Sequence, residues 1–371
     1  MKNKGIFIAA TGQNKGKTTT VLAIFRKLLD KYSKLSYMKP VGQRTIEVQG
    51  EVADEDAILM KQVFDLSNAA KALSPVTVPS GFTKNYLDGK TTNEMLIDDI
   101  LGGWNELLKE EVPVIVEGTG HAGVGSIFDM NNAHVAKLLD LPVVVVAGGG
   151  IGRPLDEIAL NLALFKQEGV QVKGVILNKC NPDKKDQVLE YCQKYLKKHD
   201  IPCLGVVEYN KTLSKPSLRR LLKDLNAELL SGKENLDVVP LKLLAGAGAL
   251  DYILDKTWKQ TVVVTPASRS DVIIAATHNF AMISEGKNTT HSEFVGIILT
   301  GDQDPHPDVL ETATQSGIPI LRTKEDTYEA IEIIENSLAK TLPGDTEKLD
   351  IIRNIYNEAI DWGKLIDIIE A

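Results

Sequence analysis

The sequence predicts an α/β protein, in which a parallel sheet with helices on both faces is followed by a smaller α/β domain. The first observation is an apolar, β-branched run, Ile6 to Ala10, which is typical of a buried parallel strand. A glycine-containing turn and an amphipathic helical pattern from Thr18 follow it directly. Further strand and helix patterns then alternate along the chain, which predicts parallel strands covered by helices.

The turn after this first strand has the order of residues expected of a P-loop, because Gly16-Lys17-Thr18 stands between strand and helix. In such a loop, backbone N–H groups and the helix N-terminus hold phosphate oxygens, the lysine reaches the β- and γ-phosphates, and the hydroxyl binds Mg²⁺. The usual first glycine is Thr11 here, which implies a loop of altered shape. The predicted nucleotide-binding residues are Gly12, Gln13, Asn14, Lys15, Gly16, Lys17, Thr18, Thr19 and Asn178. Lys15 is an extra cation that either contacts phosphate or a substrate carboxylate, or is a solvated surface lysine.

The bulk composition indicates a globular chain of two domains. With 371 residues the chain exceeds one typical domain, and 43% hydrophobic and 25% charged residues are ordinary values. The net charge of −8, from 50 acidic and 42 basic side chains, argues against a nucleic acid or a membrane surface as the main partner. No secretory signal precedes the first strand, and the three cysteines have no metal-binding spacing, so we expect a cytoplasmic protein.

Strand and helix patterns alternate through the predicted first domain, residues 1–232. They are a strand at 35–41, a short helix from Asp56, an irregular segment at 66–90, a helix at 92–109, a strand at 112–117, a helix at 131–140, a strand at 141–147, a helix from Arg153, a strand at 172–178, a helix at 184–199, a strand at 202–207 and a helix at 215–230. Glycine-rich turns follow the strands that end near 117 and 147. Ligands of such sheets bind at the carboxyl ends of the strands, so these turns indicate the site.

A polar stretch, 231–235, predicts the boundary with a second α/β domain at residues 236–340. Its expected strands lie near 237–244, 261–265, 294–300 and 318–322, with a helix near 325–338. The last residues, 345–371, place apolar side chains on one face of a single amphipathic helix. We expect this C-terminal helix to dock on the second domain or on a partner.

Two acidic side chains are the candidates to complete a magnesium site with Thr18. Glu117 ends a buried strand, and Asp56 opens the helix after the second strand. Together with phosphate and water, these oxygens would make the ligand set that Mg²⁺ prefers. Two alternatives stay open: Glu117 orders a water molecule, or Asp56 only caps its helix.

A second lysine, Lys39, stands at the end of the second strand, where Pro40 gives the chain a rigid, extended direction. We expect Lys39 to bind a substrate anion or the transferring phosphoryl group, with Lys17 as the other catalytic residue. The alternative is an exposed lysine at the end of a strand. Gln43 and Gly118 complete the predicted substrate-binding set. Asn178 ends a strand in the region where nucleotide-binding proteins read the base, and Asn181 stands where guanine requires a carboxylate. Because a neutral amide cannot accept both guanine N–H donors, ATP is favoured over GTP.

These residues together resemble the dethiobiotin synthetase family and its relatives, the cobyrinic acid a,c-diamide synthases. The shared elements are Gly16-Lys17-Thr18, Lys39-Pro40-Val41, Asp56-Ala57 and Val116-Glu117-Gly118. The resemblance implies that Lys17 and Thr18 hold ATP and Mg²⁺, that Asp56 and Glu117 hold the metal, and that Lys39 contacts a substrate carbamate. Family habit also implies a homo-oligomer.

Beyond residue 130 the chain looks closer to the N-terminal region of long phosphotransacetylases. Gly152–Ile158 and Val175–Lys179 are similar to segments of that region, and Ala249–Tyr252 and Val264–Asp271 look like its DRTGG module. The acyl-transferring domain would follow this module, so phosphotransacetylase activity is not expected of these residues. Asn14 replaces the acid that dethiobiotin synthetases carry in the loop, and Arg153 stands in place of their substrate-side asparagine, which argues against biotin synthesis.

The function that the resemblance implies is an ATP-dependent C–N ligase, which phosphorylates the carboxylate or carbamate of a small molecule before a nitrogen attacks it. The alternative is a regulatory or assembly module that senses a nucleotide without catalysis, as in the N-terminal region of phosphotransacetylases. A switch ATPase, in which Lys15 acts on the nucleotide of a partner, ranks last.

Overall fold

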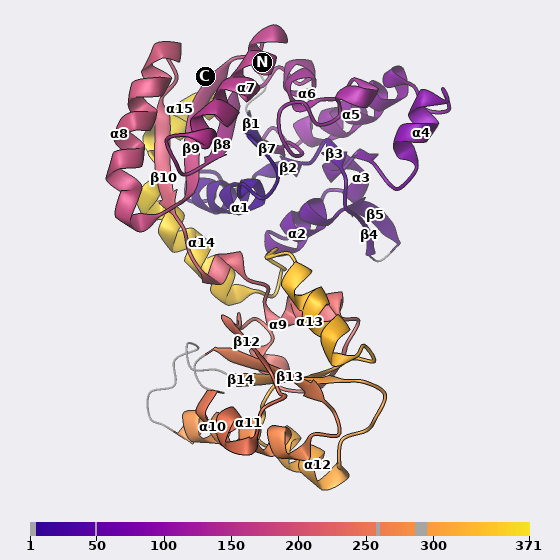
Figure 1. The fold of residues 1–371 in the computed structure, drawn as a ribbon. Helices are drawn as coiled ribbons and strands as arrows, with labels where there is room; N and C mark the ends of the chain where they lie inside the picture. The colour runs from indigo at the N-terminus through magenta and orange to yellow at the C-terminus, as the bar shows by residue number, and fades with distance from the viewer. Residues whose placement is uncertain (1–4, 49, 257–259, 286–294) are drawn as a thin grey trace. The chain divides into compact units, whose positions relative to one another are not determined.

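The computed structural model describes residues 5–48, 50–256, 260–285 and 295–371, and the chain divides into two compact units (Figure 1). The first unit comprises Met1–Tyr209 together with Ile352–Ala371, and the second comprises Asn210–Ile351. The first unit is therefore built from two separate stretches of chain. Each unit contains a sheet of its own, so the predicted α/β class with a smaller second domain is confirmed.

The sheet of the first unit has six parallel strands in the order β10-β9-β8-β1-β7-β2. They are β1 (Gly5–Ala10), β2 (Ser36–Met38), β7 (Val114–Glu117), β8 (Val143–Gly148), β9 (Val172–Cys180) and β10 (Cys203–Glu208). Every residue of β1 is buried, as its continuous apolar run predicts. Because β1 lies between β7 and β8, the loop that follows it stands at the middle of the carboxyl edge, beside Glu117 at the end of β7.

The remaining elements of the first unit are helices and two short strand pairs. Its helices are α1 (Lys17–Leu28), α2 (Glu55–Val63), α3 (Ala70–Leu73), α4 (Phe82–Leu87), α5 (Asn93–Leu108), α6 (Asn132–Leu138), α7 (Arg153–Gln167), α8 (Lys185–Leu196) and α15 (Trp362–Glu370). Two short pairs of strands accompany them: β3 (Val41–Gly42) with β6 (Val76–Thr77), and β4 (Thr45–Val48) with β5 (Glu51–Asp54). The segment at 66–90, expected to be irregular, therefore contains α3, β6 and α4. None of the helices among the described residues is long and apolar enough to cross a bilayer.

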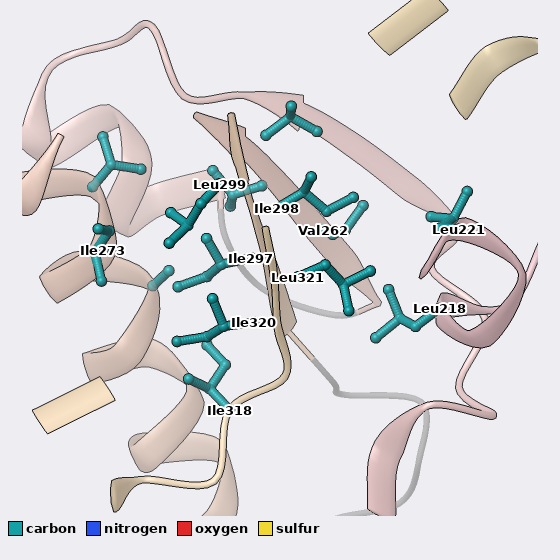
Figure 2. Packing of buried hydrophobic residues seen from close by; sticks show 14 of the residues in the cluster. Leu218, Leu221, Val262, Ile273, Ile297, Ile298, Leu299, Ile318, Ile320 and Leu321 are labelled. Carbon is teal, nitrogen blue, oxygen red and sulfur yellow. The ribbon is translucent and has the colours of Figure 1, made fainter. Parts of the chain in front are cut away.

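The second unit is built on a five-stranded sheet in the order β11-β15-β14-β13-β12, parallel except for β11. Its strands are β11 (Glu228–Ser231), β12 (Lys242–Ala245), β13 (Thr261–Pro266), β14 (Val295–Thr300) and β15 (Ile320–Arg322). Its helices are α9 (Leu218–Asp224), α10 (Leu250–Lys256), α11 (Ser270–Glu285), α12 (Pro307–Gln315) and α13 (Thr327–Asn336). Figure 2 shows its core, where Ile297, Ile298 and Leu321 of the central strands are at most 1% exposed.

The boundary between the units lies earlier than the predicted residue 232. The expected helix at 215–230 ends with Asp224 in α9, and Asn226 takes a left-handed conformation (φ 44°) that stops a helix. The chain then enters β11, which pairs with β15 of the second sheet. An antiparallel edge strand has a short apolar pattern that resembles part of a helix, which is why the sequence misplaced it.

The C-terminal stretch forms two helices instead of the single one predicted: α14 (Thr346–Ala359) and α15. The break falls at Asp361, whose side chain accepts a hydrogen bond from the backbone N–H of Lys364 and so begins a new helix. Ile360 bridges to Gly205 of β10, and α15 contacts β1 and β10. The stretch expected to dock on the second domain is therefore divided: residues up to 351 belong to the second unit, and the chain from residue 352 onward packs on the first unit.

Candidate functional site

The P-loop connects β1 to α1 through a backbone that only glycine permits at its last position. Gly16 precedes the first residue of α1 and has φ 89°, in the left-handed region. A Cβ atom there would lie 2.0 Å from Nδ2 of Asn178. Gly16 therefore serves two purposes, since it turns the chain into the helix and leaves room for the Asn178 amide.

Carbonyl groups of three consecutive loop residues are held by donors of the chain. The Asn14 oxygen accepts from Nζ of Lys179 at 2.7 Å, and the Lys15 oxygen accepts from Nδ2 of Asn178 at 3.0 Å. The Gly16 oxygen accepts from the backbone N–H and the hydroxyl of Thr20, each at 2.9 Å. Carbonyls that are bound in this way do not compete for the phosphate side of the loop, where N–H groups must point.

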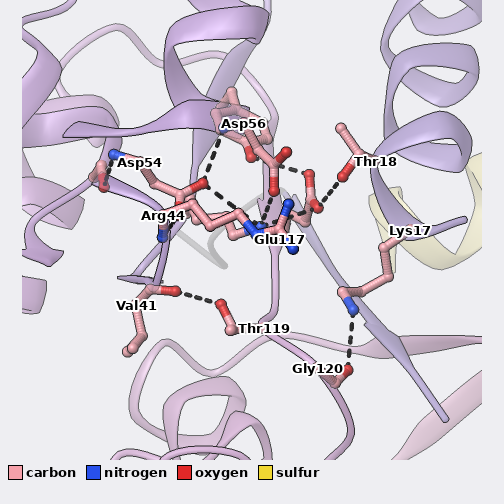
Figure 3. A network of polar contacts seen from close by, with 12 residues as sticks. Lys17, Thr18, Val41, Arg44, Asp54, Asp56, Glu117, Thr119 and Gly120 are labelled. Carbon is pink, nitrogen blue, oxygen red and sulfur yellow. Dashed lines mark hydrogen bonds and ion pairs between the residues drawn. The ribbon is translucent and has the colours of Figure 1, made fainter. Parts of the chain in front are cut away.

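The side chains of Lys17 and Thr18 both reach toward the end of β7 (Figure 3). Nζ of Lys17 donates to the carbonyl oxygen of Gly120 at 3.0 Å. Oγ1 of Thr18 donates to Oε1 of Glu117 at 2.8 Å. The helix start and the acidic strand end are thus joined directly, as the prediction that Thr18 and Glu117 share a site requires.

Lys39 lies within a group of buried carboxylates, Asp54, Asp56 and Glu117, which Figure 3 labels. Its Nζ contacts Asp56, lies 3.2 Å from Oε1 of Glu117, and lies 3.8 Å from Oδ1 of Asp54. The lysine is 5% exposed and Glu117 is 0% exposed, so water screens these charges little. The alternative of an exposed lysine at the end of the strand is therefore wrong.

Burial and charge act in opposite directions on these groups. Burial lowers the pKa of Lys39, but Asp56, Glu117 and Asp54 raise it more, so the net shift is upward and the ammonium stays charged. Burial raises the pKa of Glu117, and the neighbouring Lys39 opposes that shift without cancelling it. The hydroxyl of Tyr37 donates to Oε2 of Glu117 at 3.0 Å and so fixes the plane of the carboxylate.

Lys15 is also tied to a carboxylate. Its Nζ lies 2.7 Å from Oε2 of Glu157 in α7, which also accepts from the Thr11 hydroxyl at 3.3 Å. Arg153 binds the other oxygen, Oε1, at 2.9 Å. The hydrogen bond from Lys15 holds the pKa of the Glu157 carboxyl below its usual range. Glu157 thus orients Lys15, and the reading of Lys15 as a free surface lysine is not what the structure shows.

Three other predicted residues have different surroundings. Gln43 is exposed, although the backbone N–H of the next residue, Arg44, donates to Oδ2 of the buried Asp54 at 3.1 Å. The backbone N–H of Gly118 donates to the oxygen of Ile8, and a Cβ atom there would meet Oδ1 of Asn132 at 2.7 Å, so this glycine is needed for packing. Asn178 lies against the loop backbone, where its Oδ1 accepts from the N–H of Lys179.

The site also includes side chains that the sequence reading did not select. Tyr37 contacts Glu117, and Asp54 contacts Lys39. Glu157 contacts Lys15. Tyr356 of α14 contacts Thr20. Tyr37 and Asp54 adjoin recognised motifs, so proximity in sequence was an available signal. Glu157 and Tyr356 are distant in sequence, and no local pattern marks them.

The oxygen atoms present fit a magnesium ion that is shared with phosphate. Oγ1 of Thr18 and Oε1 of Glu117 are hard oxygen ligands that lie 2.8 Å apart. Asp56 contacts Lys39, which also contacts Glu117. Among the described residues no group of three or more His, Cys, Asp or Glu side chains forms a complete metal site. The pair Thr18 and Glu117 suits Mg²⁺, which usually takes one or two carboxylates and completes its shell with phosphate and water.

Two family models match the chain. The chain belongs to the AAA domain family, whose model matches residues 4–217. The model of the DRTGG domain matches residues 220–337. A P-loop nucleotide-binding domain followed by a DRTGG domain is therefore the organisation of this protein.

The curated relatives are of the two kinds that the sequence resembles. The phosphate acetyltransferase of Nitratidesulfovibrio vulgaris is 25% identical over 372 residues, covering 98% of this chain and 51% of that protein. The ATP-dependent dethiobiotin synthetase BioD of Thermodesulfovibrio yellowstonii is 25% identical over 239 residues, covering 61% of this chain and 98% of that protein. The chain spans about half the length of the phosphate acetyltransferases it matches.

Solved structures give weaker likenesses. The CBS and DRTGG domains of the regulatory region of Clostridium perfringens pyrophosphatase, complexed with diadenosine tetraphosphate, match with a TM-score of 0.28 and 14% identity, covering 46% of this chain and 83% of that one. The MinC:MinD complex of Aquifex aeolicus matches with a TM-score of 0.36 and 12% identity, covering 57% of this chain and 83% of that one.

Proposed function

We propose that the first unit binds Mg·ATP and transfers the γ-phosphoryl group to the carboxylate or carbamate of a small molecule. The observation that supports this most is the linkage of Lys17, Thr18, Glu117 and Lys39 at the carboxyl ends of β1, β2 and β7. A phosphate cradle, hard oxygen ligands and a second cation thereby meet at one edge of the sheet.

Each side chain has a role in this proposal. Lys17 binds the β- and γ-phosphates, and Thr18, Glu117 and Asp56 hold Mg²⁺, which neutralises the charge that develops on the transferring group. Lys39 orients the substrate acid. Because the Lys39 ammonium is already buried, the substrate carboxylate or carbamate meets a cation that has already lost its water. An oxygen of the acid then forms the new bond to the γ-phosphorus while the bond to ADP breaks. Attack by an amine nitrogen on the resulting acyl phosphate releases inorganic phosphate.

A second candidate function is a regulatory or assembly module that binds nucleotide without transferring phosphate. The observation in its favour is that the match to the phosphate acetyltransferases runs through both units and covers 98% of this chain. In this case the DRTGG domain would sense a ligand, and nucleotide binding would change assembly. For either function we propose a homo-oligomer in the cytoplasm, where ATP is abundant.

The first test is calorimetric titration of Mg·ATP, Mg·ADP and Mg·GTP into the wild type and Lys17→Ala. Lys27→Ala is the matched control, because Lys27 is on the same helix and pairs only at the surface with Asp30. We expect Lys17→Ala to weaken ATP binding at least about tenfold, because the substitution removes a charge-assisted contact to phosphate. Equal ATP affinity in Lys17→Ala and Lys27→Ala would contradict the P-loop assignment.

The second test separates the two functions by measuring phosphate release with a panel of carboxylic acids, and with diamines in bicarbonate. Turnover that one of these compounds stimulates, and that Lys39→Met abolishes, would support the ligase. Tight ATP binding without stimulated turnover, accompanied by a change of oligomer size in light scattering, would instead support the regulatory module.

A further inference from the structure

A side chain from the C-terminal helix α14 lies directly behind the P-loop. Tyr356 is 0% exposed, and its hydroxyl lies 3.0 Å from Oγ1 of Thr20. Its hydroxyl is also 4.0 Å from the position that a Cβ atom of Gly16 would take. Tyr356 and Thr20 are separated by 336 positions in the sequence, so only the return of the chain to the first unit brings them together.

The direction of the hydrogen bond follows from the number of protons available. A threonine hydroxyl has one proton, and that of Thr20 is donated to the carbonyl oxygen of Gly16 at 2.9 Å. Thr20 must therefore accept from the phenol, so Tyr356 is the donor. Burial raises the pKa of Tyr356, which keeps this proton in place.

Asn178 lies beside the phenol, because the position that a Cβ atom of Gly16 would take is 2.0 Å from Nδ2 of Asn178 and 4.0 Å from the Tyr356 hydroxyl. The Asn178 amide donates to the carbonyl oxygen of Lys15 at 3.0 Å. Tyr356 thus hydrogen-bonds to Thr20, which holds the Gly16 carbonyl, and lies beside Asn178, which holds the Lys15 carbonyl. A fixed carbonyl fixes its whole peptide plane, and with it the N–H group that faces the phosphate.

We propose that Tyr356 is a positioning residue of the nucleotide site, which acts through Thr20 and Asn178 to hold the Lys15–Gly16 and Gly16–Lys17 peptide groups in their phosphate-binding orientation. The inference rests on the proposed nucleotide binding and extends it to the end of the chain. It makes the loop complete only when α14 has returned to the first unit.

The test compares Tyr356→Phe with Tyr32→Phe in the full chain. Tyr32 donates to Oε1 of Glu370 at 2.6 Å, at an exposed site. The control therefore also removes one hydroxyl that joins residues 1–209 to residues 352–371 of the first unit. We expect Tyr356→Phe to weaken Mg·ATP binding about fivefold, the usual effect of one lost hydrogen bond. Tyr32→Phe should bind like the wild type.

A melting curve of each variant without nucleotide distinguishes positioning from a general loss of stability. An affinity of Tyr356→Phe within about twofold of that of Tyr32→Phe would overturn the proposal, whatever the melting temperatures. If Tyr356→Phe does not fold, Thr20→Val replaces it, and the same loss of affinity is expected. If Tyr356→Phe folds, a variant that carries both Tyr356→Phe and Thr20→Val should lose little more Mg·ATP affinity than either variant alone. Losses of affinity that add fully would contradict action through Thr20.

Hydrogen exchange on the nucleotide-free chain gives a result that does not depend on ATP. Peptides that cover residues 11–18 should exchange faster in Tyr356→Phe than in Tyr32→Phe, because the loop backbone is held less firmly. Equal exchange would overturn the positioning role. If the wild type itself binds no ATP, the proposed function fails, and the exchange result alone decides whether Tyr356 holds the loop.

Discussion

Lys39 has three carboxylate neighbours, Asp54, Asp56 and Glu117, and this excess of negative charge is buried. Burial raises the pKa of Glu117, and the nearby Asp56 adds to this shift, while the positive charges of Lys39 and Lys17 oppose it. A cluster of this kind costs stability while it is empty and gains a partner when a divalent cation binds. The charge imbalance is therefore consistent with the proposed magnesium site.

The first prediction concerns Glu117→Gln, which removes one buried charge and keeps the shape of the side chain. Lys39 retains Asp56 and Asp54, so we expect the free energy of unfolding at neutral pH to be unchanged or raised by about 1 kcal/mol. Mg·ATP affinity should fall by about tenfold, because a metal ligand is lost. Urea unfolding and calorimetry measure the two effects separately.

The pH dependence of this difference has a definite sign. The pKa of Glu117 is higher in the folded chain than its ordinary value, so the cost of the ionised carboxylate is relieved as the pH falls through that folded value. Any stability advantage of Glu117→Gln should therefore shrink on acidification. An advantage that grows as the pH falls would show that Glu117 is stabilised as an anion.

At the scale of the element, α14 has buried polar residues near its start as well as Tyr356 near its end. Lys348 is 0% exposed, and its Nζ donates to the backbone oxygen of Lys215 at 2.7 Å. Burial lowers the pKa of Lys348 to about 8, although the nearby Asp345 opposes the shift. Asp345 itself accepts from the Ser217 hydroxyl at 2.7 Å, so this end of the helix is fixed within the second unit.

The second prediction follows from the lowered pKa of Lys348. The unfolded chain holds this proton more tightly than the folded one, so folding becomes more favourable as the pH rises through about 8. Between about pH 7.5 and about pH 9, the wild type should gain on the order of 1 kcal/mol relative to Lys348→Met. Lys324→Met, at an exposed lysine of the same unit, keeps Lys348, so its stability should rise over this range as much as that of the wild type. Urea unfolding of the second unit at several pH values tests the slope.

At the scale of the whole molecule, the first unit depends on both ends of the chain. The C-terminal residues that are buried in it are Ile352, Tyr356, Ile360, Leu365 and Ile369. Burial of each such side chain contributes about 1.5–3 kcal/mol, and together they rival the whole stability of an ordinary domain.

The third prediction is that a chain ending at residue 351 loses the folded first unit and keeps the second. Limited proteolysis should then degrade residues 1–209 and leave 210–351 resistant, because every residue of the second unit is still present. Removal of only Glu370 and Ala371, which are exposed, should leave both units resistant. Protection of the first unit in the shorter chain would show that the C-terminal stretch is dispensable.

The sequence by itself determined the phosphate-binding loop and its immediate partners. The order strand, Gly16-Lys17-Thr18, helix is local, and the parallel sheet brings the ends of neighbouring strands to one edge. The sequence alone therefore predicted that one site contains Thr18, Glu117, Lys39 and Asp56. The structure joins these residues by hydrogen bonds and ion pairs.

Only the tertiary structure decided which distant residues complete that site and where the units divide. Glu157 and Tyr356 reach the loop across more than a hundred positions, and a contact of that kind leaves no period or spacing in the sequence. The amphipathic pattern at 345–371 showed that a face would be buried, but an apolar face has no preference of its own for one hydrophobic surface over another. Packing against β1 and β10 settles that choice, and it brings Tyr356 to the P-loop.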